Sequence, residues 1–311
     1  CGDRDPGDVI HKMNTRKDKY DISGKVHIRE GEEKIHAMME DYEGVIIWDL
    51  PSQIRNKYLK YCFSHSIRCY MSPKISDIIL LGTDRIHLFD TPLLMCRNQG
   101  LSMEQRAAKR VLDIIVSGLG IIVSSPIMLI IAIAVKAYDG GPVFYLQDRL
   151  TYQGKEFRIR KFRSMCVDSE KNGARLASKH DSRITPVGHV LRNLHLDELP
   201  QLFNVFMGDM SLVGPRPERD VIMQEYEQEI PEFHYRLKVK AGLTGYAQVY
   251  GKYNTTPYDK LKLDLFYIEN YSFLLDIKLL FMTVKIFFQK EVSEGVDDNQ
   301  KNALKDSEDK K

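Results

Sequence analysis

The stretch IIVSGLGIIVSSPIMLIIAIAV at residues 114–135 decides the class of fold, because its 22 residues carry no formal charge. As one straight helix it would extend about 33 Å at about 1.5 Å per residue, just enough to cross the hydrocarbon core of a bilayer. No other stretch of the sequence is able to enter a bilayer. The run therefore predicts a membrane-embedded helix with one domain on each side of it in the sequence.

Ser125 and Pro126 lie in the middle of this run. Proline removes a backbone hydrogen bond and clashes with the preceding helical turn, so we expect a kink there. Basic residues flank both ends of the run, as expected on the cytoplasmic side of a membrane. They are Arg106, Lys109 and Arg110 before it, and Lys136 after it. Two topologies stay open from these residues: a re-entrant helix hairpin that returns to one face, and a spanning helix with a kink.

Charge is distributed unevenly along the 311 residues. Residues 1–100 hold 15 basic and 15 acidic side chains, residues 101–290 hold 26 and 21, and residues 291–311 hold 4 and 7. The last segment has almost no large apolar residue, which predicts a disordered tail. The net charge is only +2, and the basic excess adjoins the apolar run, so a nucleic acid partner is not expected.

The five cysteines form neither a CxxC pair nor an even framework. They are Cys1, Cys62, Cys69, Cys96 and Cys166. This pattern favours free thiols in a reducing compartment.

Helical and strand patterns alternate in residues 1–100. The helical segments are 8–16, 32–41 and 52–64, and the short buried strands are 25–28, 44–48 and 67–71. Such alternation predicts an α/β module with a parallel sheet and crossover helices. CGDRDPG at 1–7 is similar to the turn after a first strand that is missing here, but it lacks a full GxGxxG. A nucleotide site and a packing or assembly role therefore stay equally open for this module.

An acidic pair, Asp197 and Glu198, opens the segment DELPQL. Alone, such a pair is usually a solvated helix start, because the helix dipole favours acids there. Two neighbours change this interpretation: Arg192 lies five residues earlier, and Arg216 follows in the rigid turn GPRPE at 214–218. Adjacent carboxylates and clustered arginines supply the nucleophile, metal ligand and positive charge that phosphoryl transfer needs.

The segment KEFRIRKFR at 155–163 predicts a strand with cations on one side, because basic and apolar residues alternate along it. A basic strand beside a membrane segment can bind anionic headgroups or a phosphorylated substrate. We expect Arg149, Lys161 and Arg163 to take part in such binding.

The sequence pattern of residues 258–289 predicts one helix. From Ser272 its sequence SFLLDIKLLFMTVKIFF is rich in Phe and Leu but interrupted by Asp276, Lys278 and Lys285. This pattern favours a helix lying in the membrane interface, with a buried core helix as the alternative.

Several motifs, in order over about residues 106–288, resemble those of bacterial sugar transferases, the monotopic phosphoglycosyl transferases. They are KRVLD at 109–113, SP at 125–126, KFRSM at 161–165, LDELPQLFNV at 196–205, GDMSLVGPRP at 208–217 and AGLTGYAQ at 241–248. Residues 1–100 resemble the Rossmann-like module that precedes the catalytic part in larger family members. In those members four transmembrane helices usually come first.

The resemblance implies a two-step exchange in which Asp197 is the nucleophile. It would attack the sugar-bearing phosphorus of a UDP-sugar and release UMP, and polyprenyl phosphate would then displace it. Glu198 is implied as the second acid, and both carboxylates as ligands of a magnesium ion, Mg2+. The substrate-binding residues expected are Arg192, Arg216, Lys161, Arg163, Arg149 and Gln248.

The resemblance also favours the re-entrant hairpin over the spanning helix. The expected order is a Rossmann-like module at 1–100, the membrane hairpin at 101–138, an α/β catalytic domain with interfacial helices at 139–290, and the tail at 291–311. The enzyme would act on the cytoplasmic face of the bacterial inner membrane, and a homodimer stays open. Ala241 and YGK at 250–252 depart from the usual family residues, which leaves the sugar unassigned.

Two rival interpretations remain. One is a non-enzymatic anchor with a degenerate transferase part, against which the intact Asp197 and Glu198 argue. The other is a spanning transferase that uses a metal-bound UDP-sugar without a covalent step. Mass spectrometry of the protein mixed with UDP-sugar alone separates these from the covalent mechanism.

Overall fold

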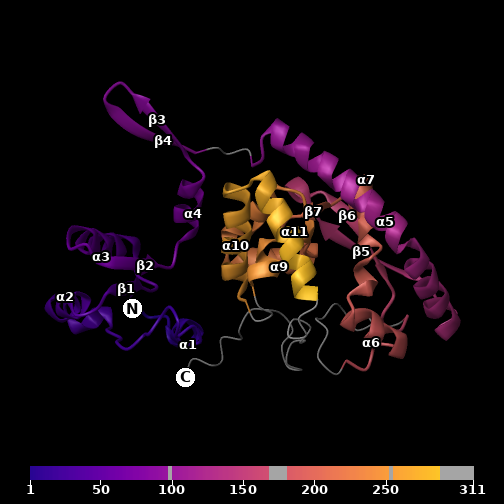
Figure 1. Ribbon diagram of the computed structural model, residues 1–311, viewed down its shortest axis with the longest axis horizontal. Helices are drawn as coiled ribbons and strands as arrows, with labels where there is room; N and C mark the ends of the chain where they lie inside the picture. Colours follow the sequence, from indigo (N-terminus) through magenta and orange to yellow (C-terminus); the bar gives the residue numbers. More distant parts are fainter. Residues whose placement is uncertain (97–99, 168–180, 252–254, 288–311) are drawn as a thin grey trace. The chain divides into compact units, whose positions relative to one another are not determined.

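The computed structural model describes residues 1–96, 100–167, 181–251 and 255–287. The chain forms two compact units, Cys1–Lys74 and Ile75–Lys311. The first unit ends before the predicted boundary at residue 100, because helix α4 (Ile75–Leu81) belongs to the second unit, where it packs against helix α10 (Pro257–Glu269). The tail predicted at 291–311 lies outside the described residues. The described fold is mixed α/β, as the sequence predicts (Figure 1).

The first unit contains a parallel pair of short strands. Strand β1 (Gly44–Ile47) and strand β2 (Arg68–Met71) are joined by helix α3 (Ser52–Ser64), which agrees with the predicted alternation. The other helical segments are α1 (Gly7–Asn14), a 3₁₀ turn at Ile28–Glu30 and α2 (Glu32–Glu40). Its core consists of Ile35, Met39, Ile47, Leu50, Tyr58 and Cys62.

The strand predicted at 25–28 is wrong. Cys1 donates its amino group to Val26 O, Ile28 N donates to Cys1 O, and Gly2 N donates to Trp48 O. Cys1 and Gly2 thus lie between this segment and β1. Residues 25–28 do not form a strand, and His27 instead caps the 3₁₀ turn that follows.

Helix α5 (Met103–Asp139) contains the whole apolar run. Ser102 and Gln105 form a capping box at its start, and Gly140 ends it in the left-handed conformation. Among the described residues it is the one helix long and apolar enough to cross a membrane, with a mean hydropathy of 2.5 in its most apolar window. Ile122, Val123, Leu129 and Ile130 are largely exposed on it, which a membrane would explain.

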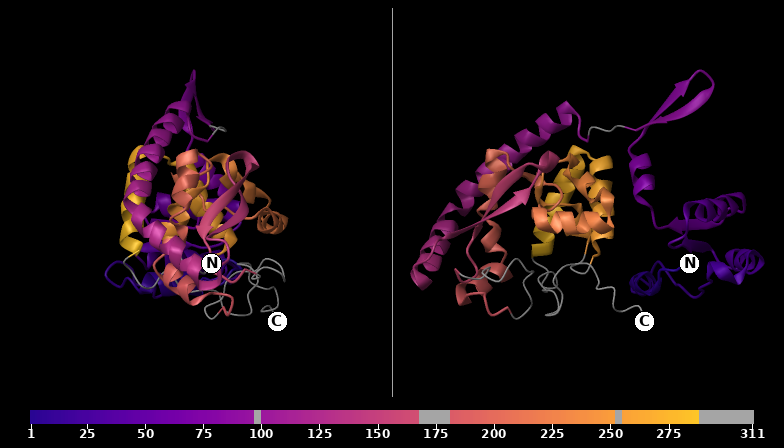
Figure 2. Two further views of the ribbon diagram at one scale, coloured as in Figure 1. Left: turned by 90° about the vertical axis from the view of Figure 1, so that its right-hand side faces the viewer. Right: turned by 180° about the vertical axis from the view of Figure 1, so that it is seen from behind.

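The hairpin expected at Ser125 and Pro126 is not observed, because α5 is one continuous helix (Figures 1 and 2). Pro126 cannot donate to the carbonyl of Ile122, four residues earlier. The Ser125 hydroxyl donates to that carbonyl instead, over 2.8 Å, and Ser124 Oγ donates to Gly120 O. The Ser125 hydroxyl thus replaces the lost hydrogen bond, and the helix continues through the proline.

Small sheets and helices form the rest of the second unit. An antiparallel hairpin, β5 (Phe144–Leu150) and β6 (Glu156–Phe162), pairs Tyr145 with Lys161, and β7 (Ser211–Val213) is parallel to β8 (Gly242–Thr244). A separate hairpin consists of β3 (Asp84–Leu88) and β4 (Thr91–Met95). The remaining helices are α6 (Pro186–Asn193), α7 (Gln201–Met207), α8 (Asp220–Glu229), the 3₁₀ segment Pro231–Lys238, α9 (Tyr246–Tyr250), α10 (Pro257–Glu269) and α11 (Phe273–Phe287), with short 3₁₀ turns at Tyr152–Gly154 and Leu196–Glu198.

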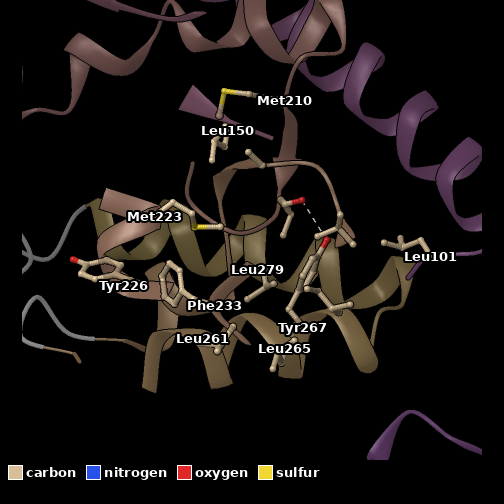
Figure 3. Close-up of a cluster of buried hydrophobic side chains, with 14 of the residues drawn as sticks. Leu101, Leu150, Met210, Met223, Tyr226, Phe233, Leu261, Leu265, Tyr267 and Leu279 are labelled. Atoms are coloured by element: carbon tan, nitrogen blue, oxygen red, sulfur yellow. Dashed lines mark hydrogen bonds between the residues drawn. The ribbon is translucent and has the colours of Figure 1, made fainter. Parts of the chain in front are cut away.

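The main core of this unit lies among α8, α10, α11 and the strands β7 and β8. Figure 3 shows Met223, Tyr226, Phe233, Leu261 and Leu265 gathered in it. The single helix predicted over 258–289 is two helices, α10 and α11. Asn270 ends α10, and Ser272 Oγ accepts from Leu275 N at the start of α11.

Helix α11 has two different faces. Asp276 and Leu279 are fully buried, and Asp276 pairs with Lys109 of α5 over 2.6 Å. Leu274 and Phe281 are exposed. One face therefore packs in the core, and the predicted position of α11 in the membrane interface stays a prediction for the other face.

Candidate active site

The acidic pair lies in a short 3₁₀ turn, Leu196–Glu198, between α6 and α7. His195 precedes it with φ 53°, a left-handed conformation that costs energy for a residue other than glycine. Leu196 and Leu199 pack against a cluster that includes Met128 and Ile131 of α5. The two leucines thus fix the carboxylates between them next to the apolar helix.

The two carboxylates have opposite electrostatic environments. Burial raises the pKa of Asp197, which is 8 % exposed, although the charges of Lys161 and Arg192 oppose this. Burial would also raise the pKa of Glu198, but Lys161 and Arg216 outweigh it by charge and hydrogen bonds and hold that pKa well below its usual range. Separated pKa values of neighbouring acids are typical of catalytic pairs.

Lys161 and Arg216 share one oxygen of Glu198. Lys161 Nζ lies 2.6 Å from Glu198 Oε1, and Arg216 Nη2 lies 2.9 Å from the same atom. Lys161 is on β6, as the alternating pattern predicts, and burial lowers its pKa although Glu198 opposes this. Arg216 is less buried, with 44 % of its side chain exposed, so its guanidinium can reach a ligand from solvent.

Asn204 fixes the distance between the acidic pair and β6. It is fully buried on α7, its Oδ1 accepts from Arg160 N, and its Nδ2 donates to Arg158 O. The amide therefore joins the helix that follows Glu198 to the strand that carries Lys161.

Arg192 is held beside the pair by a close approach of α6. A Cβ on Gly188 would overlap the Ser164 carbonyl, so glycine lets α6 lie against the chain after β6. Arg192 Nε then donates to Ser164 Oγ over 3.0 Å. Its charge acts on Asp197 in the direction that favours the carboxylate.

Three predicted binding residues have other contacts. Arg163 lies just beyond the end of β6, where it donates to Asp139 at the end of α5 and to Pro142 O. Arg149 donates to Pro217 O over 3.0 Å, and burial lowers its pKa to about 10. Gln248 lies on α9 and donates to Leu243 O. The structure therefore does not bring these side chains to the acidic pair, although Arg149 braces the turn that carries Arg216.

The acidic pair fits the kind of donor set that Mg2+ uses. No group of three or more His, Cys, Asp or Glu side chains lies together among the described residues. Mg2+ is usually bound through one or two carboxylates, with water and substrate phosphates completing its coordination. Asp197 and Glu198 supply two carboxylates, so the magnesium site stays a prediction that these residues can satisfy.

Two further acids were missed by the sequence reasoning. Asp139 pairs with Arg163, and Asp264 of α10 pairs with Arg236 in the core. Asp264 could have been noticed as one acid in the apolar run LDLFYI at 263–268, because a buried carboxylate requires a partner. Nothing in the sequence indicates which cation that partner is.

Together these residues form a candidate site for an anionic ligand beside the apolar helix α5. A buried carboxylate can attack an electrophilic phosphorus, and Lys161, Arg192 and Arg216 provide positive charge around it. The fold and the site therefore have the features of a membrane-associated group-transfer enzyme.

Comparison with known families agrees with this class. The model of the bacterial sugar transferase family matches residues 104–290, so the chain belongs to that family. The matched region includes α5, the acidic pair and the Gly-Pro-Arg-Pro turn.

Three relatives illustrate the similarity. A UDP-N-acetylgalactosamine-undecaprenyl-phosphate N-acetylgalactosaminephosphotransferase of Aeromonas hydrophila is 44 % identical over 180 residues, covering 57 % of this chain and 43 % of its own length. A UDP-glucose:undecaprenyl-phosphate glucose-1-phosphate transferase of Klebsiella pneumoniae is 38 % identical, covering 81 % and 54 %. An undecaprenyl-phosphate galactose phosphotransferase of Salmonella typhimurium is 36 % identical, covering 70 % and 49 %. The chain thus spans about half the length of these relatives.

Proposed function

We propose that this protein transfers a sugar 1-phosphate from a UDP-sugar to polyprenyl phosphate, such as undecaprenyl phosphate, and so starts assembly of a surface polysaccharide or glycoconjugate. The names of three relatives, which describe this type of transfer, support the proposal. The observation that carries it is the buried Asp197 beside Glu198, whose Oε1 is shared by Lys161 and Arg216.

The transfer takes two displacements at phosphorus. In the first, an oxygen of the Asp197 carboxylate forms a bond to the sugar-bearing phosphorus, and the bond from that phosphorus to the UMP oxygen breaks. UMP leaves with the electron pair. In the second, a phosphate oxygen of the polyprenyl phosphate attacks the same phosphorus, the bond to Asp197 breaks, and the carboxylate is restored. One site can then serve a soluble substrate and a lipid substrate in turn.

The cations beside the acids have separate roles in this scheme. Lys161 keeps Glu198 ionised and lowers the cost of a second carboxylate beside it. Arg216 and Arg192 would neutralise charge on the diphosphate as UMP leaves. When bound, Mg2+ would be held by Asp197 and Glu198 and would neutralise phosphate charge there.

Replacement of the nucleophile tests the proposal. Asp197→Asn keeps the volume of the side chain but removes the attacking charge, so we expect a loss of at least about a thousandfold in UMP release. The mass increase of one phosphosugar, present in the unmodified protein mixed with UDP-sugar alone, should disappear. Asn204→Asp, a change of similar size on α7, is not a valid control because Asn204 is buried. Asp148→Asn on β5, where the side chain is 68 % exposed, is the matched control and should keep both signals.

An adduct that persists in Asp197→Asn would exclude Asp197 as the nucleophile. UMP release without any adduct in the unmodified protein would favour a direct transfer.

We further propose that both ends of α5 face the cytoplasm at the inner membrane. The basic residues at both ends of the apolar run support this orientation, and the continuous helix would have to bend or lie obliquely in the bilayer to achieve it. Single cysteines at Arg106 and Gly140, in a chain whose own cysteines are replaced, should react with an impermeant thiol reagent from the same side. Labelling from opposite sides would show a spanning helix.

The sugar is not fixed by the family. The three relatives are named for N-acetylgalactosamine, glucose and galactose. Measuring UMP release over a panel of UDP-sugars with this protein identifies the donor directly, because discrimination among such similar sugars depends on pocket contacts.

A further inference from the structure

The turn that carries Arg216 cannot supply enough hydrogen-bond donors for its own backbone carbonyls. Pro215 and Pro217 have no N–H, so the turn has few donors for its carbonyl groups. The four carbonyls of residues 215–218 nevertheless each have a donor from another segment. Gly242 N donates to Pro215 O, Arg236 Nη2 to Arg216 O, Arg149 Nη1 to Pro217 O and Leu150 N to Glu218 O.

Close packing holds the start of the same turn. A Cβ on Gly214 would overlap the Lys240 carbonyl, and Gly214 N donates to Thr244 O over 2.8 Å. The backbone before Arg216 is therefore fixed to β8. The carbonyls of Arg216 and Pro217 accept from side-chain donors instead, and Arg236 is the donor to Arg216 itself.

Arg236 is buried in the core and makes polar contacts with three groups. It is 2 % exposed, and its Nε and Nη2 lie 2.9 and 2.7 Å from Asp264 Oδ2 on α10. Nη2 also donates to Arg216 O over 3.1 Å, and Nη1 lies 3.5 Å from Glu218 Oε1. The Phe233 ring lies 4.9 Å from the centre of the guanidinium. One planar group thus joins α10 to two residues of the turn.

Such a pair is not an efficient way to stabilise a core. Removing two charges from water is costly, and apolar residues of similar volume often serve stability as well or better. A planar guanidinium, however, fixes direction, because its donors lie in a rigid plane. The pair is therefore better explained by the position that it gives to the turn.

We propose that Arg236, oriented by Asp264, is a positioning residue that directs Arg216 toward the substrate diphosphate and Glu198. The inference rests on the proposed function, because it assigns a role at the same site. Arg236 itself is buried behind the turn and would not contact the substrate.

A double-mutant cycle between Arg236 and Arg216 tests this role. Arg236→Lys keeps a cation beside Asp264 but removes the fork that reaches Arg216 O and Glu218. We expect kcat/KM for UDP-sugar and the affinity for UDP to fall about tenfold each, as for loss of one charge-assisted contact. In an Arg216→Ala background, the same substitution should change either value less than about twofold, because the group being positioned is gone.

Asp264→Asn provides a second variant of the pair. It keeps the side-chain volume and a hydrogen-bond acceptor but weakens the contact that orients Arg236. Its losses in kcat/KM and UDP affinity should likewise be present with Arg216 and nearly absent in the Arg216→Ala background. All values are taken on the monodisperse fraction from size-exclusion chromatography, so that misfolded protein does not contribute.

Asp276→Asn is the matched control, because Lys109 and Asp276 form a buried pair in the same unit without a contact to the turn. Its effect on affinity should be the same with and without Arg216→Ala. Equal losses for Arg236→Lys in both backgrounds would mean a purely structural role and would overturn the inference, as would no UDP binding by the unmodified protein. UDP binding with the expected cycle but no UMP release would support the inference and overturn the proposed function.

Discussion

Five ion pairs of the unit Cys1–Lys74 lie on its surface, whereas several ion pairs of the unit Ile75–Lys311 are buried. The surface pairs are Arg16 with Asp18, Lys25 with Asp5, Arg29 with Asp3, Lys34 with Glu30, and Lys57 with Glu32. The buried or partly buried pairs are Lys109 with Asp276, Lys161 with Glu198, Arg236 with Asp264, and Arg163 with Asp139.

This difference indicates which ion pairs have a structural or functional role. Exposed pairs contribute little, because water and salt screen them. A buried pair is retained at a cost in desolvation, and here three of the four hold a named part: α11 on α5, the acidic pair on β6, and the turn of Arg216. The residues of the proposed reaction lie in the unit that contains these buried pairs.

The largest effect should come from breaking the pair between α5 and α11. Asp276→Ala leaves Lys109 buried without its carboxylate and removes one of the two acceptors of Tyr267 Oη, so unfolding should become easier by about 3–5 kcal/mol. Denaturant titration in detergent micelles measures this. Lys57→Ala, at a surface pair with half-exposed side chains, should cost less than about 1 kcal/mol.

Equal losses of unfolding free energy in Asp276→Ala and Lys57→Ala would contradict the difference between buried and surface ion pairs. Lys109→Met combined with Asp276→Leu should recover part of the loss, because no unpaired charge remains.

Acid should next distinguish the buried carboxylates from the exposed ones. Burial alone would raise the pKa of Glu218, but the charges of Lys260, Arg236 and Arg149 outweigh it and lower that pKa from 4.5 to about 2. A lowered native pKa gives stability that is fully present above 4.5 and is lost as the pH falls toward 2. The free energy of unfolding should therefore drop over this range, by up to about 3 kcal/mol from this group.

Glu218→Gln should remove that part of the acid dependence. Glu32→Gln, at a fully exposed pair, should leave the acid dependence nearly unchanged, because solvent screens the interaction. An unchanged profile in Glu218→Gln would mean that the cluster around the turn does not stabilise the ionised carboxylate.

The smallest of these effects concerns Arg216. Arg216→Lys keeps the charge but loses the planar fork, and contacts of this kind contribute roughly 1.5–3 kcal/mol. Turnover of UDP-sugar should fall about tenfold to a hundredfold, at roughly 1.4 kcal/mol per decade. Steady-state UMP release measures it, with Arg219→Lys, also near the turn, as a control that should change little. Unchanged kinetics with a lower melting temperature would mean that Arg216 only braces the turn.

Much of the local structure could be predicted from the sequence. The helix at 52–64, the parallel strands on either side of it and the basic strand at 156–162 follow from residue periodicity, which acts over a few residues. The prediction at 25–28 was wrong because His27 caps a 3₁₀ turn, with its ring accepting from Arg29 N, and the alternating pattern does not reveal this cap. The single helix at 258–289 was wrong because capping at Asn270 and Ser272 ends one helix and begins another.

Pro126 is the position where the predicted hairpin is not observed. The hairpin was predicted from the missing donor, but the hydroxyl one residue earlier supplies a hydrogen bond to the same carbonyl, and the helix continues. The serine is visible in the sequence, whereas the direction of its hydroxyl is set by the side-chain rotamer in the folded helix.

The sequence by itself determined the apolar run, the acidic pair and the proline turn, because each depends on neighbouring residues. Only the tertiary structure decided which cations meet the acids. Lys161 and Arg163 are two residues apart and have similar patterns, yet Lys161 reaches Glu198 while Arg163, beyond the end of β6, turns to Asp139. The sequence shows where a charged residue is but not toward which partner its side chain points. The partner is decided when Leu196 and Leu199 pack on α5 and thereby fix the position of the carboxylates.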